Sequence, residues 1–241
     1  MKWVLIAAAA GSLACRGSTE DAGEQRTSLP APPMRPSDEA CNFEGDPNGT
    51  PVLITGFERF PTDSEHENVS EVAVRALRPS ALGGIRVMRM ILPVEYDHAA
   101  ERAVEQISRC RPAFVIGLGQ GGATIDLERA AYNLKNGAMA DNRGSIVHDE
   151  PILVGGPAQR ETMLPLTAID TALRAIGESP VMSNDPGRYI CNNVFYVVVG
   201  AAAAQGARAG FIHLPLTTTF SPAERARWGR VAEVIVEAAT R

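Results

Sequence analysis

The chain has 241 residues, of which 45% are hydrophobic, and its formal net charge is −5 at pH 7. This is enough for one globular domain with a sizeable core plus a further segment. The negative charge and the lack of a basic run argue against nucleic acid as a partner. The cysteines are too few and too scattered to predict a disulfide framework or a zinc site, and the sequence leaves the redox state of Cys41 and Cys110 open. The four cysteines of the chain are Cys15, Cys41, Cys110 and Cys191.

Residues 1–15, MKWVLIAAAAGSLAC, carry one positive charge, an apolar run too short to span a bilayer, and small residues at the end. This pattern is typical of a secretory signal peptide, and its end is similar to the lipobox of bacterial lipoproteins. We therefore expect an exported protein, either anchored in a membrane by a lipid on Cys15 or free in the periplasm or outside the cell. The alternative to lipidation is ordinary cleavage near Ala14, which leaves Cys15 as a free thiol.

Residues 16–50 are polar and rich in Pro, Ser and Gly. Such a segment buries too little apolar surface to offset the entropy of ordering, so it predicts a disordered tether without packed contacts to the rest of the chain. The folded body is expected to span residues 51–241.

Within the body, apolar runs and apolar residues at helical spacing alternate. In chain order they predict a strand at 51–57, a helix at 70–77, a strand at 84–94, a helix at 98–109, a strand at 112–119, an extended segment at 124–134, a helix at 166–177, a strand at 180–184, a helix at 191–206, a strand at 209–215 and a helix at 221–241. Ser221 is the expected N-cap of the last helix. The order predicts a three-layer α/β/α sandwich around a mostly parallel mixed sheet, in which ligands bind at the carboxyl ends of the strands.

Three residues are candidates for chemistry. Cys191 lies at the start of a predicted helix, where free N–H groups and a partial positive charge favour the thiolate. His213 follows an apolar strand, and Glu128 is a carboxylate in a semi-apolar segment. Each also has an ordinary interpretation, namely an inert buried cysteine, a core histidine, and a surface charge paired with Arg129. A catalytic thiolate needs a base and a group that orients the base.

Five short motifs occur in a fixed order: VLITGFERF (52–60), GLGQGG (117–122), LERAAYN (127–133), DPGRYICNNVFY (185–196) and GFIHLP (210–215). Together they resemble the pyroglutamyl-peptidase I, or pyrrolidone carboxyl peptidase, family of cysteine peptidases. The resemblance runs from about Pro51 through the final helix, although the part after His213 matches only loosely.

The resemblance implies that the family's Glu–Cys–His triad falls on Glu128, Cys191 and His213. It implies an omega-peptidase that hydrolyses N-terminal pyroglutamate from peptides through a thioester acyl-enzyme, without a metal or cofactor. Whether such a protein forms a homo-oligomer, and which residue it prefers after pyroglutamate, stay open.

The same resemblance implies the substrate site. Aromatic walls around the pyroglutamyl ring correspond to Phe57, Phe60 and Tyr189, and polar partners of the lactam correspond to Gln120 and Asn68. These residue types suit the ligand, because pyroglutamate is a small neutral ring with one amide.

The chain departs from the family's pattern at two places. Ala138 stands where many bacterial members carry Arg, with Arg143 nearby as a possible substitute, and ERFPT (58–62) stands where EPFGG is usual. These departures keep two alternatives open. One is a catalytically weak or inactive surface lipoprotein that binds pyroglutamyl peptides, and the other is a related thiol amidase.

Overall fold

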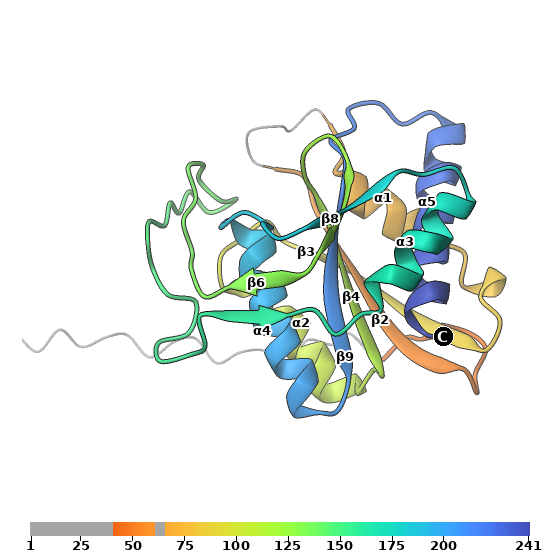
Figure 1. Cartoon of the computed structure of the whole chain (residues 1–241), viewed down its shortest axis with the longest axis horizontal. Helices are drawn as coiled ribbons and strands as arrows, with labels where there is room; N and C mark the ends of the chain where they lie inside the picture. Colours follow the sequence, from red (N-terminus) through yellow and green to blue (C-terminus); the bar gives the residue numbers. More distant parts are fainter. Residues whose placement is uncertain (1–40, 61–65) are drawn as a thin grey trace, which may run out of the picture. The chain divides into compact units, whose positions relative to one another are not determined.

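The computed structural model describes residues 41–60 and 66–241 (Figure 1). The strands are β1 (Glu44–Gly45), β2 (Thr50–Phe57), β3 (Ile85–Leu92), β4 (Phe114–Gln120), β5 (Ile125–Glu128), β6 (Ala130–Tyr132), β7 (Gln159–Glu161), β8 (Pro180–Ser183) and β9 (Arg208–Leu214). The helices are α1 (Val69–Ala76), α2 (His98–Cys110), α3 (Leu166–Ala175), α4 (Ile190–Ala204) and α5 (Pro222–Ala239), with a 3-10 turn, η1 (Pro79–Ala81).

The main sheet has seven strands in the order β1-β3-β2-β4-β9-β5-β8. The four central strands β3, β2, β4 and β9 are parallel to one another. Mixed pairing appears toward the edges, where β1 is antiparallel to β3 and β5 is antiparallel to β9 but parallel to β8. The expectation of a mostly parallel mixed sheet is confirmed, and the extended segment at 124–134 forms β5 and β6.

Helices cover both faces of this sheet. Helices α1, α3 and α5 pack on one face and α2 and α4 on the other, each around its own apolar cluster (Figure 1). The strands alternate between the two layers: Ile212 and Leu214 of β9 join the first cluster and Phe211 joins the second. Because side chains on a strand alternate with a period of two, His213 faces the same layer as Phe211 and α4.

The N-terminus of the last helix, α5, is capped as the sequence predicts. Ser221 accepts a hydrogen bond from the Glu224 backbone, and the Glu224 side chain accepts one from the Ser221 backbone, which makes a capping box. Trp228, in the middle of α5, is fully buried. The predicted N-cap is therefore confirmed.

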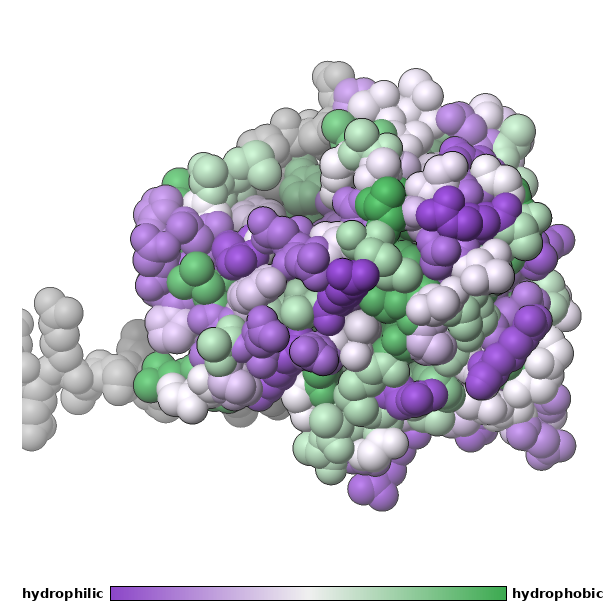
Figure 2. Space-filling view, in the orientation of Figure 1, coloured by the Kyte–Doolittle hydropathy of each residue, from purple (hydrophilic) through white to green (hydrophobic). Residues whose placement is uncertain are grey.

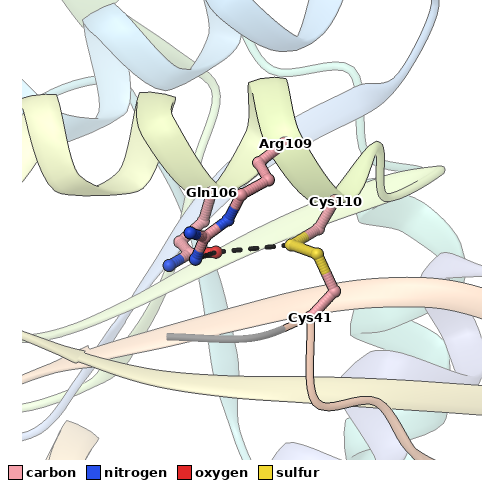
Figure 3. The surroundings of a disulfide bond; sticks show 4 residues. All are labelled: Cys41, Gln106, Arg109 and Cys110. Atoms are coloured by element: carbon pink, nitrogen blue, oxygen red, sulfur yellow. Dashed lines mark hydrogen bonds between the residues drawn. A yellow bond between two sulfur atoms is a disulfide. The ribbon is translucent and has the colours of Figure 1, made fainter. Parts of the chain in front are cut away.

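The prediction of a free tether through residue 50 is wrong for residues 41–50. Cys41 forms a disulfide with Cys110 at the end of α2 (Figure 3). In addition, β1 pairs with β3. Gln106, one turn earlier in α2, lies with its Oε1 atom 3.3 Å from Cys110 Sγ (Figure 3). The two cysteines are 69 residues apart in sequence, so their spacing carried no sign of the pairing. Residues 1–40, with the expected signal peptide and most of the tether, lie outside the described residues.

A long connection joins β6 to β7 at the left of Figure 1, and the surface there is largely hydrophilic in Figure 2. The Asn133 side chain holds two parts of this connection together, because its Oδ1 accepts a hydrogen bond from Leu153 N at 2.7 Å and its Nδ2 donates one to Leu153 O at 2.8 Å.

Among the described residues, no helix has both the length and the apolar character needed to cross a membrane.

We expect the Cys41–Cys110 disulfide to stabilise the body. Replacing both cysteines by Ala should lower the free energy of unfolding by about 2–4 kcal/mol, because the cross-link no longer restricts a long loop of the unfolded chain. Urea unfolding of the double variant and of the wild type measures the loss. Dithiothreitol should destabilise the wild type by a similar amount and leave the variant unaffected. Equal unfolding midpoints for the two proteins would contradict this expectation.

Candidate active site

Cys191 lies in the first turn of α4. A Pro186-Gly187 turn precedes the helix, and Gly187 adopts a φ of 73°, a conformation that glycine takes without steric cost. Tyr189 is the N-cap and makes no side-chain capping hydrogen bond. The first N–H groups of α4 are thus not used by a cap, and they surround a buried free cysteine.

His213 and Glu128 meet across the antiparallel β5–β9 pair. The buried imidazole donates Nδ1–H to Glu128 Oε1 at 2.7 Å, and Glu128 is itself only 1% exposed. The Cys191 side chain lies beside the same imidazole and interacts with it. Burial alone lowers the pKa of His213, but the hydrogen bonds to Cys191 and Glu128, together with the charges of these two groups, outweigh it and raise that pKa to about 10. The imidazolium form is therefore favoured at neutral pH.

Glycines of the GLGQGG motif make room for the histidine. A Cβ at Gly119 would lie 2.8 Å from the Phe211 ring and 3.0 Å from His213 Cδ2. A Cβ at Gly121 would lie 2.8 Å from His213 Cβ. A larger residue at Gly119 would press on the Phe211 ring and the edge of the imidazole, and one at Gly121 would displace His213 itself. The absence of side chains at these two glycines therefore helps to shape the site. In the sequence only Gln120 of this motif had an expected role, and nothing there indicated that the glycines make room for His213.

A small, closely packed cavity adjoins Cys191, and in this structure it is too narrow to hold a free water molecule. It is lined by Phe57, Phe60, Asn68, Val94, Gln120, Tyr189, Ile190 and Cys191. All five residues proposed from the sequence for the pyroglutamyl ring therefore lie together. The rings of Phe60 and Tyr189 are nearly parallel, with centroids 6.4 Å apart and an interplanar angle of 25°. Val94 and Ile190 were missed, since nothing distinguished them from other apolar residues.

Tyr189 is held from two sides. Its hydroxyl donates to Ala140 O at 2.9 Å, and Tyr96 packs edge-on against its ring at 5.4 Å. Burial, with smaller contributions from Asp141 and Cys191, raises the pKa of Tyr189 to about 12, which keeps the hydroxyl protonated and able to donate. These contacts thus hold the Tyr189 ring in place.

The two amide side chains at the cavity, Asn68 and Gln120, differ in how many of their hydrogen-bonding groups are already used within the protein. Asn68 caps α1: its Oδ1 accepts from Ser70 N and Ser70 Oγ, and its Nδ2 donates to Glu58 O. Gln120 Oε1 accepts from Val69 N at 3.1 Å, and this bond orients the amide group. Asn68 therefore serves the local fold with most of its hydrogen-bonding groups.

A larger cleft continues from the cavity. Phe60, Gln120, Tyr189 and Cys191 line both. The rest of the cleft is formed by Gly121, Gly122, Asp126, Glu128, Asn136, Gly137, Ala138, Met139, Asp185, Pro186, Gly187, Arg188, His213 and Leu216. The cavity and the cleft thus meet at the cysteine.

The structure does not support Arg143 as a substitute for an arginine at Ala138. Ala138 lines the cleft, whereas the Arg143 guanidinium pairs with Glu95 at 2.7 Å and is largely exposed. The cation that lines the cleft is Arg188, which pairs with Asp185 at 2.6 Å and lies over the Tyr132 ring.

Glu58, the first residue of the altered ERFPT stretch, is held in place by hydrogen bonds to other segments. Glu58 Oε1 accepts hydrogen bonds from Asn142 Nδ2 at 2.6 Å and from the Val94 backbone at 3.3 Å. Glu58 therefore ties the end of β2 to the connection between β6 and β7. Residues 61–65 lie outside the described residues.

These features are those of an α/β thiol hydrolase, with its site at the carboxyl edge of a parallel sheet. The chain belongs to the pyroglutamyl peptidase family of cysteine peptidases, whose family model matches residues 50–226. It is 38% identical over 167 residues to the pyrrolidone-carboxylate peptidase of Pseudomonas fluorescens, covering 68% of this chain and 78% of the relative. The corresponding protein of Chromobacterium violaceum is 39% identical over 166 residues, with 68% and 77% covered.

Solved structures agree with this assignment. The pyrrolidone carboxyl peptidase from Thermococcus litoralis superposes with a TM-score of 0.71 at 28% identity, covering 79% of this chain and 93% of that one. A mutant of the Pyrococcus furiosus protein gives the same TM-score and identity and is covered over 98% of its length.

The glycine motif provides a test of the site geometry. Gly119→Ala should lower kcat/KM for a pyroglutamyl amide by roughly tenfold or more, because the added methyl would press on both the Phe211 ring and the His213 imidazole and so shift His213 beside Cys191. Gly83→Ala is the matched control, since a Cβ at Gly83 meets nothing within 4 Å. Steady-state kinetics and a thermal melt of both variants separate a displaced imidazole from a loss of folding. A fully active Gly119→Ala would show that the histidine does not need this space.

Proposed function

We propose that this protein hydrolyses the bond after an N-terminal pyroglutamate, with Cys191 as nucleophile, His213 as acid and base, and Glu128 as the group that orients His213. The observation that carries the proposal is the junction at Cys191. On one side lies a small cavity with aromatic walls, and on the other an open cleft over His213. A ring held in the cavity presents its carbonyl to the cysteine, while the rest of the peptide extends along the cleft.

The residues that line the cavity suit a small neutral ring, for which the aromatic side chains must move apart on binding. Phe60 and Tyr189 offer nearly parallel aromatic faces, and Phe57 forms part of the wall. The ligand has one amide that needs a partner, and Gln120 is better placed than Asn68 to supply it, since the Asn68 amide is used by α1 and the Glu58 backbone. We therefore assign recognition of the lactam to Gln120 and a supporting role to Asn68.

Acylation begins with the Cys191 thiolate, which forms a bond to the carbonyl carbon that follows the pyroglutamyl ring. The carbonyl electron pair moves onto oxygen, and unused N–H groups at the start of α4 stabilise this oxyanion. When the pair returns, the C–N bond breaks and His213 gives its proton to the departing amine. A thioester on Cys191 remains.

In deacylation His213 acts as a base, whereas in acylation it acts as an acid. His213, now neutral, takes a proton from water as the water attacks the thioester. Collapse of that intermediate releases pyroglutamate and restores the thiolate–imidazolium pair. Throughout, Glu128 holds Nδ1–H, so that the other ring nitrogen faces the reacting atoms.

Hydrolysis and thiol reactivity together test this assignment. Cys191→Ala should lower the hydrolysis of a fluorogenic pyroglutamyl amide by roughly a thousandfold or more. In the wild type, iodoacetamide should alkylate Cys191 rapidly at neutral pH, because the raised pKa of His213 keeps the imidazolium beside the thiolate until the pH approaches 10. Glu128→Gln removes one charge that favours the imidazolium, so alkylation of this variant should be slower at neutral pH and should need a more alkaline pH than in the wild type.

Mass spectrometry of the alkylated peptide assigns the reaction to Cys191. Full hydrolysis by Cys191→Ala would refute the nucleophile. A wild type that binds pyroglutamyl peptides without cleaving them would favour the binding lipoprotein instead.

We further propose that the protein is exported and held at a membrane by a lipid on Cys15. The pattern of residues 1–15 is one support, and the Cys41–Cys110 disulfide is an independent one, because disulfides persist mainly in oxidising compartments. The pairing also matters for the nucleophile: Cys191 is the only free cysteine among the described residues, so the described part of the chain offers it no thiol partner.

Cell fractionation tests the anchor. Cys15→Ser should move the protein from the membrane fraction to the soluble fraction, since the lipid no longer has an attachment site. Cys41→Ser is the control, because it removes a cysteine outside the lipobox-like segment and should leave the protein in the membrane fraction. Membrane association that persists in Cys15→Ser would rule out lipidation at this residue.

A further inference from the structure

Asp126 lies directly beside the proposed base. It pairs with His213 across the antiparallel β5–β9 ladder, and Glu128 pairs with Phe211 two residues deeper. Residues opposite each other in such a ladder project to the same face, as do residues two apart on one strand. Asp126 and Glu128 therefore both face the cleft, and Asp126 is nearer to the edge of the sheet where β9 ends.

The charge of Asp126 is not compensated. Its Oδ1 accepts a hydrogen bond from Thr124 Oγ1 at 2.5 Å, and Asp126 forms no ion pair within the part of the chain that the structure describes. The other acids of the cleft are paired: Glu128 with His213, and Asp185 with Arg188. A negative potential thus remains on the side of the cleft where Asp126 lies.

The path of the peptide leads to this side. If the ring occupies the small cavity, the departing amine must lie within reach of His213, which protonates it. The first residue of the departing peptide then lies on the His213 side of Cys191, in the cleft that Asp126 lines together with Leu216 and Met139. The last two are exposed apolar side chains, 57% and 47% accessible, that can contact the methylene groups of a long side chain.

We propose, on the basis of the function assigned above, that Asp126 is a specificity residue that favours Lys or Arg immediately after pyroglutamate and disfavours Asp or Glu. A long basic side chain packs its methylene groups on Leu216 and Met139 and brings its charge to the Asp126 carboxylate. An acidic side chain meets the same carboxylate as a like charge. The selection acts on the departing residue only, and the ring cavity is the same for all substrates.

Three peptides provide the test. They are amidated at the carboxyl end and differ only at the residue after pyroglutamate, which is Lys, Gln or Glu. For the wild type at low salt, kcat/KM should fall in that order, with about a fivefold spread between Lys and Glu, since the carboxylate is partly solvated. Asp126→Asn should bring the Lys-to-Glu ratio close to one. High salt should narrow the wild-type ratio in the same direction.

The control variant is Asp170→Asn on α3, which changes the net charge equally and lies outside the cleft. It should keep the wild-type ratio. An unchanged ratio in Asp126→Asn, or no discrimination in the wild type that hydrolyses the Gln peptide, would overturn the role of Asp126 while leaving the proposed hydrolysis intact. Failure to cleave any of the three peptides would overturn both.

Discussion

The hydrogen bond between Glu128 and His213 is the interaction on which the site depends. A carboxylate that is 1% exposed is costly to bury alone, and the imidazolium beside it supplies the compensating charge. This bond needs β5 antiparallel to β9, which is one of the two places where strand direction reverses in the mostly parallel sheet. It also needs the space that Gly119 and Gly121 leave around the ring. Fold and chemistry are thus linked by one pair of strands.

Much of this could be predicted from the chain itself. The strands and helices of the body follow from apolar periodicity, and Cys191 and His213 stand at ends of elements, where sheets of this kind gather functional groups. Glu128 was different, because a carboxylate beside Arg129 looks like a surface charge until its partner strand is known. The order of the motifs, rather than any single residue, pointed to it.

Other features depend on contacts between distant parts of the chain, which no local pattern encodes. The Cys41–Cys110 disulfide joins residues 69 positions apart, and β1 is a two-residue strand in a polar segment. The role of Asn68 could not be separated from that of Gln120, because both are amides and only the hydrogen bonds show which one caps α1. Likewise, Arg143 is near Ala138 in sequence, but its guanidinium pairs with Glu95.

The disulfide has a consequence for how the molecule meets its surroundings. Cys110 ends α2 shortly before β4 begins at Phe114, so the bond to Cys41 lies near the end of the sheet where the parallel strands begin. The cleft lies at the opposite end, where β4 and β9 finish. The disulfide and the cleft thus occupy opposite ends of the sheet, so the cross-link that holds the first strands together lies away from the path by which a ligand enters the cleft.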